Sequence, residues 1–245
     1  MHLLVVNPNT TASMTRKIGA AARLVASPGT VVEAVNPAMG PVSIEGFYDE
    51  AFCLPGLITE VMAGAARGAE AAIVACFDDP GVDACRAAVS IPVLGICEAA
   101  MRIAGFLGQR FTIVTTQAVS LPAMEGLIRR YGMEGRGQAR AAGVPVLALE
   151  DPASGAVARV RAEIRRAIEE DGAETILLGC AGMADLARAL SAEMGLPVID
   201  GVAAAVKLAE GLVGLGLATA KIGGYAPPAT KAYAGMLAGF APATA

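Results

Sequence analysis

The sequence predicts an α/β protein with two pseudo-symmetric, doubly wound lobes, each built on a parallel four-stranded sheet. Continuously apolar runs alternate with Ala-rich stretches of helical periodicity, the pattern of parallel strands covered by helices on both faces. The two halves also carry copies of one segment, since residues 68–76 read GAEAAIVAC and residues 172–180 read GAETILLGC. The copies continue at 91–95 and 196–200 with one residue inserted. This duplication predicts two similar lobes around a central cleft.

Four apolar runs bounded by turn residues predict the strands of the first half: Leu3–Val6, Val31–Val35, Ala72–Ala75 and Pro92–Leu94. A helix is expected over Leu57–Arg67, and Thr10 or Thr11 is expected to cap the helix after the first strand. Asp79 is followed by a proline, which predicts a capping carboxylate at a helix start. The segment Asn36–Gly56 is rich in Gly and Pro, so we expect a long loop that forms a lid or wall of a site.

The second half repeats this order. Its predicted strands are Phe111–Val114, Gln138–Ala141, Thr175–Leu178 and Pro197–Ile199. Its predicted helices are Leu121–Arg130, Ala156–Glu170 and Met183–Ser191. Helical crossovers between strands of one sheet make the strands parallel, so the polar ends of both sheets are expected to face the cleft.

Composition narrows the classes of function. Hydrophobic residues make up 55% of the 245 residues and charged residues 17%, so a large core is expected and disorder is not. The net charge of −4, with scattered Lys and Arg, argues against nucleic acid or an anionic membrane as a partner. The apolar stretches are too short or too interrupted for a membrane span or a signal peptide, so we expect a cytoplasmic protein. Five cysteines are an odd number, and free thiols are expected.

Polar residues and cysteines follow four of the predicted strands at positions that correspond between the two copies. Asn9 follows the first strand, Cys76 the third, Thr115 and Thr116 the fifth, and Cys180 the seventh. Ligands of open α/β sheets bind outside the carboxyl ends of the strands, so these residues are expected in one shared cleft. For Asn9 and the two threonines, ordinary capping and turn chemistry is an equally good explanation.

Cys76 and Cys180 form the candidate catalytic pair. Each is expected where a strand meets a helix N-terminus, where the helix dipole and free N–H groups favour a thiolate. Asp78 would oppose the ionisation of Cys76 if its carboxylate points toward the sulfur, and its role stays open. The remaining three cysteines have no counterpart in the other half and are expected to be packing residues: Cys53, Cys85 and Cys97.

Several chemistries do not fit the sequence. His2 is the only histidine, so neither a zinc or iron site nor a cysteine–histidine pair is expected. Neither a Walker A motif nor a dinucleotide-binding glycine motif follows a predicted strand. No lysine lies at a predicted strand end, which argues against a pyridoxal phosphate enzyme. We therefore expect no metal and no cofactor, and acid–base chemistry by thiols remains.

Several motifs along the chain resemble the aspartate/glutamate racemase superfamily, and within it the hydantoin and allantoin racemase branch. The motifs are NPNT at 7–10, GPVSIEG at 40–46, ACFDDPG at 75–81, GCAGM at 179–183 and YAPP at 225–228. The resemblance implies a cofactor-independent mechanism with two thiols, Cys76 and Cys180. It also implies substrate contacts by a further set of residues: Asn9, Ile44, Phe77, Thr115, Thr116 and Ala181. By the same resemblance, residues 107–208 form a lobe inserted into a first lobe of residues 1–106 and 209–245.

The hydantoin and allantoin racemase branch is inferred from positions at which this sequence differs from the amino-acid racemases of the superfamily. Those enzymes carry Asp-Ser near the first strand, a polar residue after the first cysteine, and Thr with an acidic residue or His after the second. Here the corresponding residues are Asn7-Pro8-Asn9, Phe77 and Ala181-Gly182, which suit a neutral ring better than a charged amino acid. The sequence thus predicts a racemase of a 5-substituted hydantoin, with allantoin as one candidate, that forms a homo-oligomer.

Other functions remain open at this point. An amino-acid racemase of the aspartate/glutamate type or a maleate cis-trans isomerase would use the same scaffold with two thiols. An arylmalonate decarboxylase uses one cysteine, so the presence of both disfavours it. A non-enzymatic binding protein with two lobes is a further alternative, against which stand the paired thiols and the missing export signal.

Overall fold

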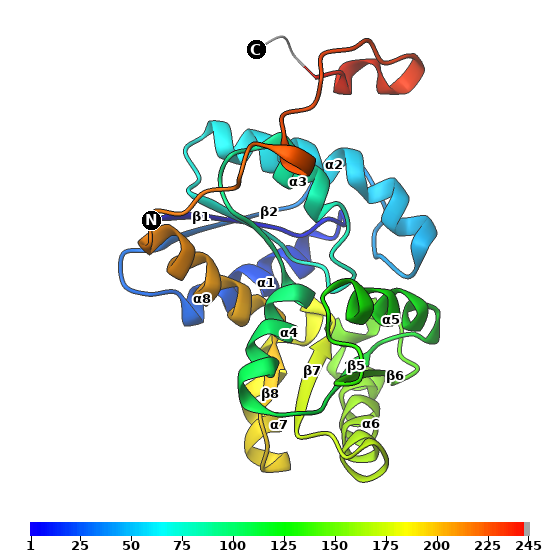
Figure 1. The fold of residues 1–245 in the computed structure, drawn as a ribbon. Helices are drawn as coiled ribbons and strands as arrows, with labels where there is room; N and C mark the ends of the chain where they lie inside the picture. The colour runs from blue at the N-terminus through cyan, green and yellow to red at the C-terminus, as the bar shows by residue number, and fades with distance from the viewer. Residues whose placement is uncertain (243–245) are drawn as a thin grey trace.

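Two parallel four-stranded sheets of the same topology form the framework of the computed structural model, which describes residues 1–242 (Figure 1). The first lobe contains the sheet of order β2-β1-β3-β4 and the second lobe the sheet of order β6-β5-β7-β8. In the register, Val5 lies opposite Ile73 in the first sheet and Ile113 opposite Leu177 in the second. These pairs occupy the same place in the repeat. The predicted fold class, with two α/β lobes, is confirmed.

The strands agree with the predicted runs to within one or two residues: β1 His2–Val6, β2 Val31–Val35, β3 Ala71–Val74, β4 Val93–Gly95, β5 Phe111–Thr115, β6 Gly137–Ala141, β7 Thr175–Gly179 and β8 Val198–Asp200. The helices connect them: α1 Ala12–Val25, α2 Phe47–Ala66, α3 Val82–Ala88, α4 Ile96–Leu107, α5 Leu121–Arg130, α6 Ala156–Asp171, α7 Ala187–Met194 and α8 Gly201–Gly214. Short 3-10 helices include Ala181–Leu186, Gly223–Tyr225 and Gly235–Phe240.

Both central strands that precede the cysteines are buried along their whole length, β3 and β7. Three clusters of buried residues cover the sheets. One lies between the first sheet and α2 and α3, and another between the second sheet and α6 and α7. The largest cluster joins the inner faces of both sheets through α1, α4, α5 and α8. The two lobes therefore share part of their core. This shared core fixes the relative position of the two sheet edges that border the cavity. Among residues 1–242, none of the helices combines the length and apolar character needed to cross a membrane.

The predicted long loop Asn36–Gly56 is wrong in its second part, because α2 begins at Phe47. Pro55 and the adjacent glycine suggested a break, yet Pro55 lies inside the helix. Asp49 and Glu50 lie in the first turn of α2, where carboxylates interact favourably with the helix dipole. The loop is thus limited to residues 36–46, between β2 and α2.

The expected caps also differ from the observed ones. Thr11 lies at the N-cap position of α1 but donates its hydroxyl to the carbonyl of Val42, while Asn9 Oδ1 accepts from the Thr11 N–H at 2.9 Å. Asp79 does not cap α3, whose N-cap is Gly81; it caps α4 instead. The helix expected over Met183–Ser191 begins later, because residues 181–186 form a 3-10 helix before α7.

The division into residues 1–106 with 209–245 and residues 107–208 stays a prediction, and residues 243–245 lie outside the described part. Helix α8 runs across the predicted boundary and packs on elements of both sheets. After α8, the N–H of Thr219 donates to the Ser90 carbonyl at 2.9 Å, and Lys221 Nζ donates to the carbonyl of Ala87 at 2.7 Å. The chain that follows α8 therefore lies along the first lobe.

Candidate active site

A cavity between the lobes is lined by residues that follow β1, β3, β5 and β7 at their carboxyl ends. It contains both candidate cysteines, Cys76 and Cys180, which occupy the same position after the third strand of each sheet. All six residues expected to contact substrate also line it: Asn9, Ile44, Phe77, Thr115, Thr116 and Ala181. The fold thus brings the whole predicted set into one place, from two lobes.

Hydrogen bonds fix the loop after β1 against α1. Asn7 Nδ2 donates to Asn9 Oδ1 at 2.8 Å and to Thr15 Oγ1 at 3.0 Å. The side-chain oxygen of Asn9 is therefore engaged, whereas among residues 1–242 its Nδ2 donates only to the weakly accepting sulfur of Met14, at 3.3 Å. Because Asn9 lines the cavity, this amide presents a donor that a substrate oxygen can use.

The two threonines after β5 differ in what their hydroxyls contact. Thr115 Oγ1 donates to the Gly179 carbonyl at 3.1 Å and so holds the end of β7, next to Cys180. Thr116, which is buried and lines the cavity, makes no comparable hydroxyl bond within residues 1–242. Thr116 is thus the freer donor toward a bound molecule.

Neither cysteine lies at an α-helix N-terminus, contrary to expectation. Cys76 is followed by a turn in which the Asp79 N–H donates to the Cys76 carbonyl at 3.1 Å, and α3 begins only at Val82. Cys180 precedes a short 3-10 helix. The backbone N–H groups near the sulfurs belong to Asp78 and Gly182, each two residues after its cysteine.

Burial dominates the ionisation of both thiols. It raises the pKa of Cys180 to about 11, against the lowering effect of the Gly182 N–H. Burial and then the carboxyl of Asp78 raise the pKa of Cys76 well above its usual value. Both residues are therefore thiols at neutral pH. The expected depression of their pKa is wrong, since desolvation outweighs the local N–H groups.

Asp78 lines the cavity beside Cys76 and forms a pair with the carboxyl of Glu50 from the first turn of α2. Burial and then the Glu50 carboxyl raise the pKa of Asp78 to about 8. Two carboxyl groups so placed share a proton, because both cannot be charged at close range. Asp78 is accordingly neutral at neutral pH and does not repel a thiolate at Cys76.

Asp79 connects the cysteine loop to the second lobe. Its oxygens accept from the N–H groups of Cys97 and Glu98 at 3.0 and 2.8 Å, and from the Tyr131 hydroxyl at 2.8 Å. Burial raises the pKa of Asp79 to about 7, although these three donors favour its carboxylate form. Tyr131 follows α5, so the loop that carries Cys76 is tied to both lobes.

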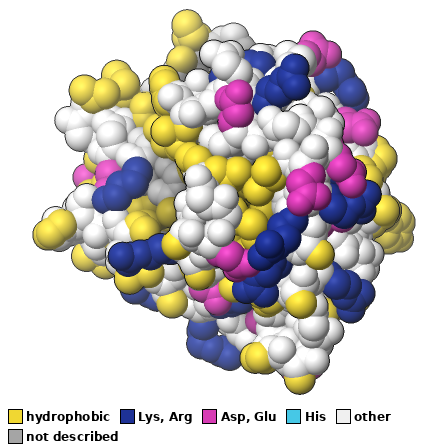
Figure 2. Space-filling model, turned by 90° about the horizontal axis from the view of Figure 1, so that it is seen from below, with side chains coloured by type: hydrophobic (Ala, Val, Ile, Leu, Met, Phe, Trp, Pro, Cys, Tyr) yellow, Lys and Arg dark blue, Asp and Glu magenta, His cyan; other side chains and the backbone are white. Residues whose placement is uncertain are grey.

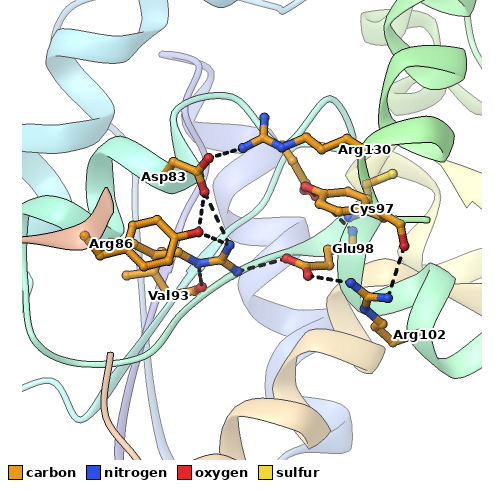
Figure 3. A network of polar contacts seen from close by, with 10 residues as sticks. Asp83, Arg86, Val93, Cys97, Glu98, Arg102 and Arg130 are labelled. Carbon is orange, nitrogen blue, oxygen red and sulfur yellow. Dashed lines mark hydrogen bonds and ion pairs between the residues drawn. The ribbon is translucent and has the colours of Figure 1, made fainter. Parts of the chain in front are cut away.

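A network of charged side chains lies around this connection (Figure 3). Arg86 of α3 donates to Glu98 of α4 at 2.9 Å, and Arg102 donates to the other oxygen of Glu98 at 3.2 Å. Arg130 of α5 pairs with Asp83 of α3, which bridges the two lobes a second time. The network surrounds the joint between the lobes, away from the cavity.

Seven further residues line the cavity that the sequence argument did not select: Asn7, Met14, Ala75, Asp78, Ser120, Val146 and Gly179. The repeat could have found some of them. Val146 lies in the loop after β6 as Ile44 lies in the loop after β2, and Ser120 lies in the loop after β5 as Asn9 lies in the loop after β1.

The three cysteines assigned to packing are fully buried and all five cysteines are free thiols. Within residues 1–242, no group of three or more His, Cys, Asp or Glu side chains could hold a metal ion. The lining residues include no Lys, Arg or His.

The sequence matches the model of the Asp/Glu/hydantoin racemase family over residues 3–209. The chain belongs to this family. Among racemases of the family it is similar to hydantoin racemase from Rhizobium meliloti, with 48% identity over 236 residues, 96% of this chain and 98% of the relative. The resemblance inferred from the motifs is thereby confirmed.

Solved structures of two allantoin racemases also support the assignment to this family. An allantoin racemase from Klebsiella pneumoniae is 46% identical with a TM-score of 0.96, and the match covers 99% of each chain. Allantoin racemase from Pseudomonas fluorescens is 40% identical with a TM-score of 0.92, and the match covers 96% of this chain and all of that one.

Proposed function

We propose that the protein is a cofactor-independent racemase of a 5-substituted hydantoin, a class that includes allantoin. The observation that carries this proposal is the single cavity into which the two lobes bring Cys76 and Cys180 from equivalent positions. Two thiols on opposite lobes suit a reaction in which a proton leaves one face of a carbon and another arrives on the opposite face. The names of the hydantoin and allantoin racemases to which the chain is similar supply the substrate class.

In the proposed reaction, one cysteine acts as a thiolate and removes the proton from the ring carbon that carries the substituent. The electron pair moves onto the adjacent ring carbonyl and gives an enolate. The other cysteine, as a thiol, then protonates the same carbon from the opposite side. For the reverse enantiomer the two cysteines exchange roles, so one proton is taken and one returned in each turnover.

The enolate oxygen needs donors that are already in place. Asn9 Nδ2 and the hydroxyls of Thr116 and Ser120 are side-chain donors in the cavity. The N–H groups of Asp78 and Gly182 stabilise the thiolates. Thr115 acts indirectly, since its hydroxyl is engaged with Gly179. Neutral Asp78 leaves the thiolate form of Cys76 accessible at neutral pH.

The lining also supports a neutral ring as substrate. It contains no cation that could pair with the carboxylate of an amino acid, and Ile44, Phe77 and Val146 supply an apolar surface. A planar ring with amide groups can be buried there without leaving a charge unpaired, whereas an α-carboxylate could not. This favours a hydantoin over aspartate, glutamate or maleate.

We also propose that the enzyme is a cytoplasmic homo-oligomer. Five free cysteines fit a reducing compartment. Exposed apolar side chains on α4, just after α8 and near the C-terminus fit association between copies.

The test uses enantiopure 5-substituted hydantoins, allantoin, aspartate and glutamate with the purified protein in heavy water. Cys76→Ser and Cys180→Ser should each lower net racemisation by several orders of magnitude, because acid and base act as one unit. Each variant keeps one thiol and should still exchange the ring proton of one enantiomer, and the two variants should select opposite enantiomers.

Polarimetry follows racemisation and proton NMR follows exchange. Near-wild-type racemisation by either variant would show that the thiols are packing residues. Racemisation of the amino acids but not of the hydantoins would refute the substrate class while keeping the mechanism.

A further inference from the structure

The carboxyls of Asp78 and Glu50 form an acidic pair beside the cavity that has no balancing cation. Figure 2 shows basic side chains lying beside acidic ones on one face of the molecule. The groups that shift the pKa of Asp78 and Glu50 include no such cation, although Asp78 is buried in the cavity lining. Glu50 Oε1 is buried too, and no N–H or O–H group within residues 1–242 donates to it. A buried carboxyl oxygen needs a donor, and a proton held between the two carboxyls supplies one.

The pair also connects Cys76 to the surface. The N–H of Asp78 donates to the Cys76 sulfur, and the Asp78 carboxyl lies beside that sulfur in the cavity lining. A hydrogen bond joins this carboxyl to the carboxyl of Glu50. Glu50 is partly exposed to solvent, and the preceding residues in the first turn of α2, Phe47 and Tyr48, are 62% and 77% exposed. Exchangeable groups therefore follow one another from the sulfur to the edge of the molecule.

The proposed racemisation needs protons to move between turnovers, and this inference rests on that proposed function. After one turnover the cysteine that began as a thiolate is a thiol, and the other cysteine is a thiolate. A second molecule of the same enantiomer can react only after one proton has left the first sulfur and one has reached the second. The space for water in the cavity is about 30 Å³, enough for about two molecules and too little for a chain of waters that spans the protein.

We propose that Asp78 and Glu50 relay protons between Cys76 and solvent and thereby reset the enzyme after each turnover. To remove a proton, the Cys76 thiol transfers it to Asp78, the proton that the pair already shares passes to Glu50, and Glu50 releases it to water. To supply one, Glu50 takes a proton from water and Asp78 passes the shared proton to the Cys76 thiolate. The pair holds one proton before and after each transfer, so the protons balance and no oxidant is needed.

The relay serves only one of the two cysteines. Gly182 stands two residues after Cys180, where Asp78 stands two residues after Cys76, and within residues 1–242 Asp78 is the only acidic residue of the lining. Cys180 instead exchanges with the water that replaces the product, and the charge of Lys17 favours its thiolate. The two thiols thus reset by different routes, which a comparison of the two enantiomers can separate.

The titratable groups next to the pair are engaged elsewhere. Asp79 accepts from two N–H groups of α4 and from the Tyr131 hydroxyl, and Cys53 donates its thiol to the backbone carbonyl of Glu50 at 3.1 Å. Burial raises the pKa of Cys53 to about 12, so this thiol stays protonated. Burial is also the largest cause of the raised pKa of Asp78, so an apolar residue in place of Glu50 leaves that pKa raised.

Deuterium exchange distinguishes the two routes. A racemic 5-substituted hydantoin at saturating concentration is incubated with the full-length protein in heavy water, and chiral chromatography with mass spectrometry gives the deuterium content of each enantiomer. The wild type should deuterate both enantiomers at similar rates. In the Glu50→Met variant, the proton that Cys76 takes from one molecule stays on the sulfur and is returned to the next, whereas Cys180 still exchanges. One enantiomer should therefore gain deuterium about tenfold more slowly or less, since positioned proton-transfer groups contribute about 10²- to 10⁴-fold.

Substrate concentration and a second variant exclude a structural cause. Far below KM the Glu50→Met enzyme has time to reset before it binds another molecule, so the lag of one enantiomer should disappear. Glu50→Gln keeps the size and hydrogen bonding of the side chain but carries no transferable proton, and it should show the same lag at saturation. Glu60→Met, on the same helix and outside the lining, is the matched control and should deuterate both enantiomers as the wild type does.

The lagging enantiomer should be the one whose proton the Cys180→Ser variant exchanges, because Cys76 is the remaining thiol there. Adding Glu50→Met to Cys180→Ser should slow this exchange by a similar factor, and adding it to Cys76→Ser should not slow exchange of the other enantiomer. Equal deuteration of both enantiomers by the two Glu50 variants would overturn the relay and leave the racemase proposal intact. A wild type that neither racemises nor deuterates any hydantoin would instead refute the proposed function, and the relay with it.

Discussion

One cysteine of the pair Cys76 and Cys180 must become a thiolate, yet burial in the cavity disfavours the charged form. The effect of each surrounding residue therefore depends on whether it favours or disfavours the thiolate. Desolvation raises the pKa of both thiols; the N–H groups of Asp78 and Gly182 oppose it, as does the charge of Lys17 at Cys180. A pair of thiols can nevertheless work, because the base needs to be a thiolate in only a small fraction of molecules, and a thiolate of high pKa is a stronger base. The activity of the racemase is therefore expected to rise with pH.

The Asp78→Asn variant tests the carboxyl beside Cys76. In the wild type, Asp78 holds its proton below about pH 8 and becomes an anion above it, where it raises the pKa of Cys76 further. The amide stays neutral throughout, so the variant should gain activity relative to the wild type only at alkaline pH. The ratio of kcat/KM at about pH 9.5 to that at about pH 7 should increase by up to about tenfold, which one pKa unit represents.

The matched control for this profile is Glu134→Gln, because Glu134 is an exposed carboxylate after α5, outside the cavity lining. It should leave the ratio unchanged. An equal ratio for the Asp78→Asn variant and the wild type would mean that the charge of Asp78 does not reach the sulfur.

The cysteine pair could be found from the sequence because a repeat fixes topology, and topology fixes which strand ends meet. The pKa of the thiols could not be found in this way. It depends on burial and on the carboxyl of Asp78 next to Cys76, and Asp78 in turn pairs with Glu50, so the contacts join the loop after β3 to helix α2. The expectation of a helix start at Cys76 was wrong for a similar reason, since residues 76–81 form a turn and α3 begins only at Val82.

At the scale of elements, the end of β4 and the start of α4 are shaped around one carboxylate. Asp79 accepts from the first N–H groups of α4, and Gly95 immediately precedes that helix. A Cβ added to Gly95 would lie 2.2 Å from the carboxyl carbon of Asp79. The glycine backbone there has φ of −87°, which every residue type can adopt, so the requirement for glycine is one of space alone.

Gly95→Ala should therefore destabilise the protein by about 1–3 kcal/mol, the usual cost of overfilling a packed site. Because the displaced Asp79 holds the loop of Cys76, racemisation should fall as well. Thermal unfolding and racemisation assays check both effects. Gly126→Ala in α5 is the control: the added Cβ meets nothing within 4 Å, and alanine should stabilise the helix by about 0.4–1 kcal/mol. Equal stability of the two variants would contradict this explanation.

Sequence patterns predicted the elements better than their ends. Helix α5 has the predicted bounds because its apolar spacing is regular and a proline lies in its first turn. The start of α2 was hidden by Pro55, a residue that breaks most helices but here is retained within α2. The role of Asp79 was likewise hidden, because its partners in α4 lie 18 and 19 residues further along the chain.

At the scale of the molecule, bonds between the lobes close the cavity. Glu45 Oε1 accepts from the Val146 N–H at 2.9 Å. The side chains of Ile44 and Val146 are both buried, although neither residue lies in an α-helix or a strand. Ile44 and Val146 thus form a roof contributed by both lobes. The hydroxyl of Ser13 donates to Glu150 Oε2 at 2.9 Å, a further contact between the lobes that is exposed to solvent. We expect the substrate to enter past this roof, so the Glu45 contact is expected to control access.

The Glu45→Ala variant should open the roof more easily and let water reach the thiols. Burial is the largest cause of the raised pKa of Cys180, and the charge of Glu45 contributes to it, so both effects of the substitution lower this pKa. Iodoacetamide should then inactivate the variant faster than the wild type at the same pH, since it reacts with the thiolate. At the same time kcat should fall, because a wetter cavity stabilises the enolate less well.

Two further variants separate closure from charge. Glu45→Gln removes the charge but keeps an oxygen that can accept from Val146, so its alkylation rate should lie between those of Glu45→Ala and the wild type. Glu150→Ala removes the exposed contact between the same lobes and should change neither alkylation nor kcat. If Glu45→Ala reacted with iodoacetamide no faster than Glu150→Ala, the roof would not limit access to the thiols, and the substrate would have to enter on another side of the cavity.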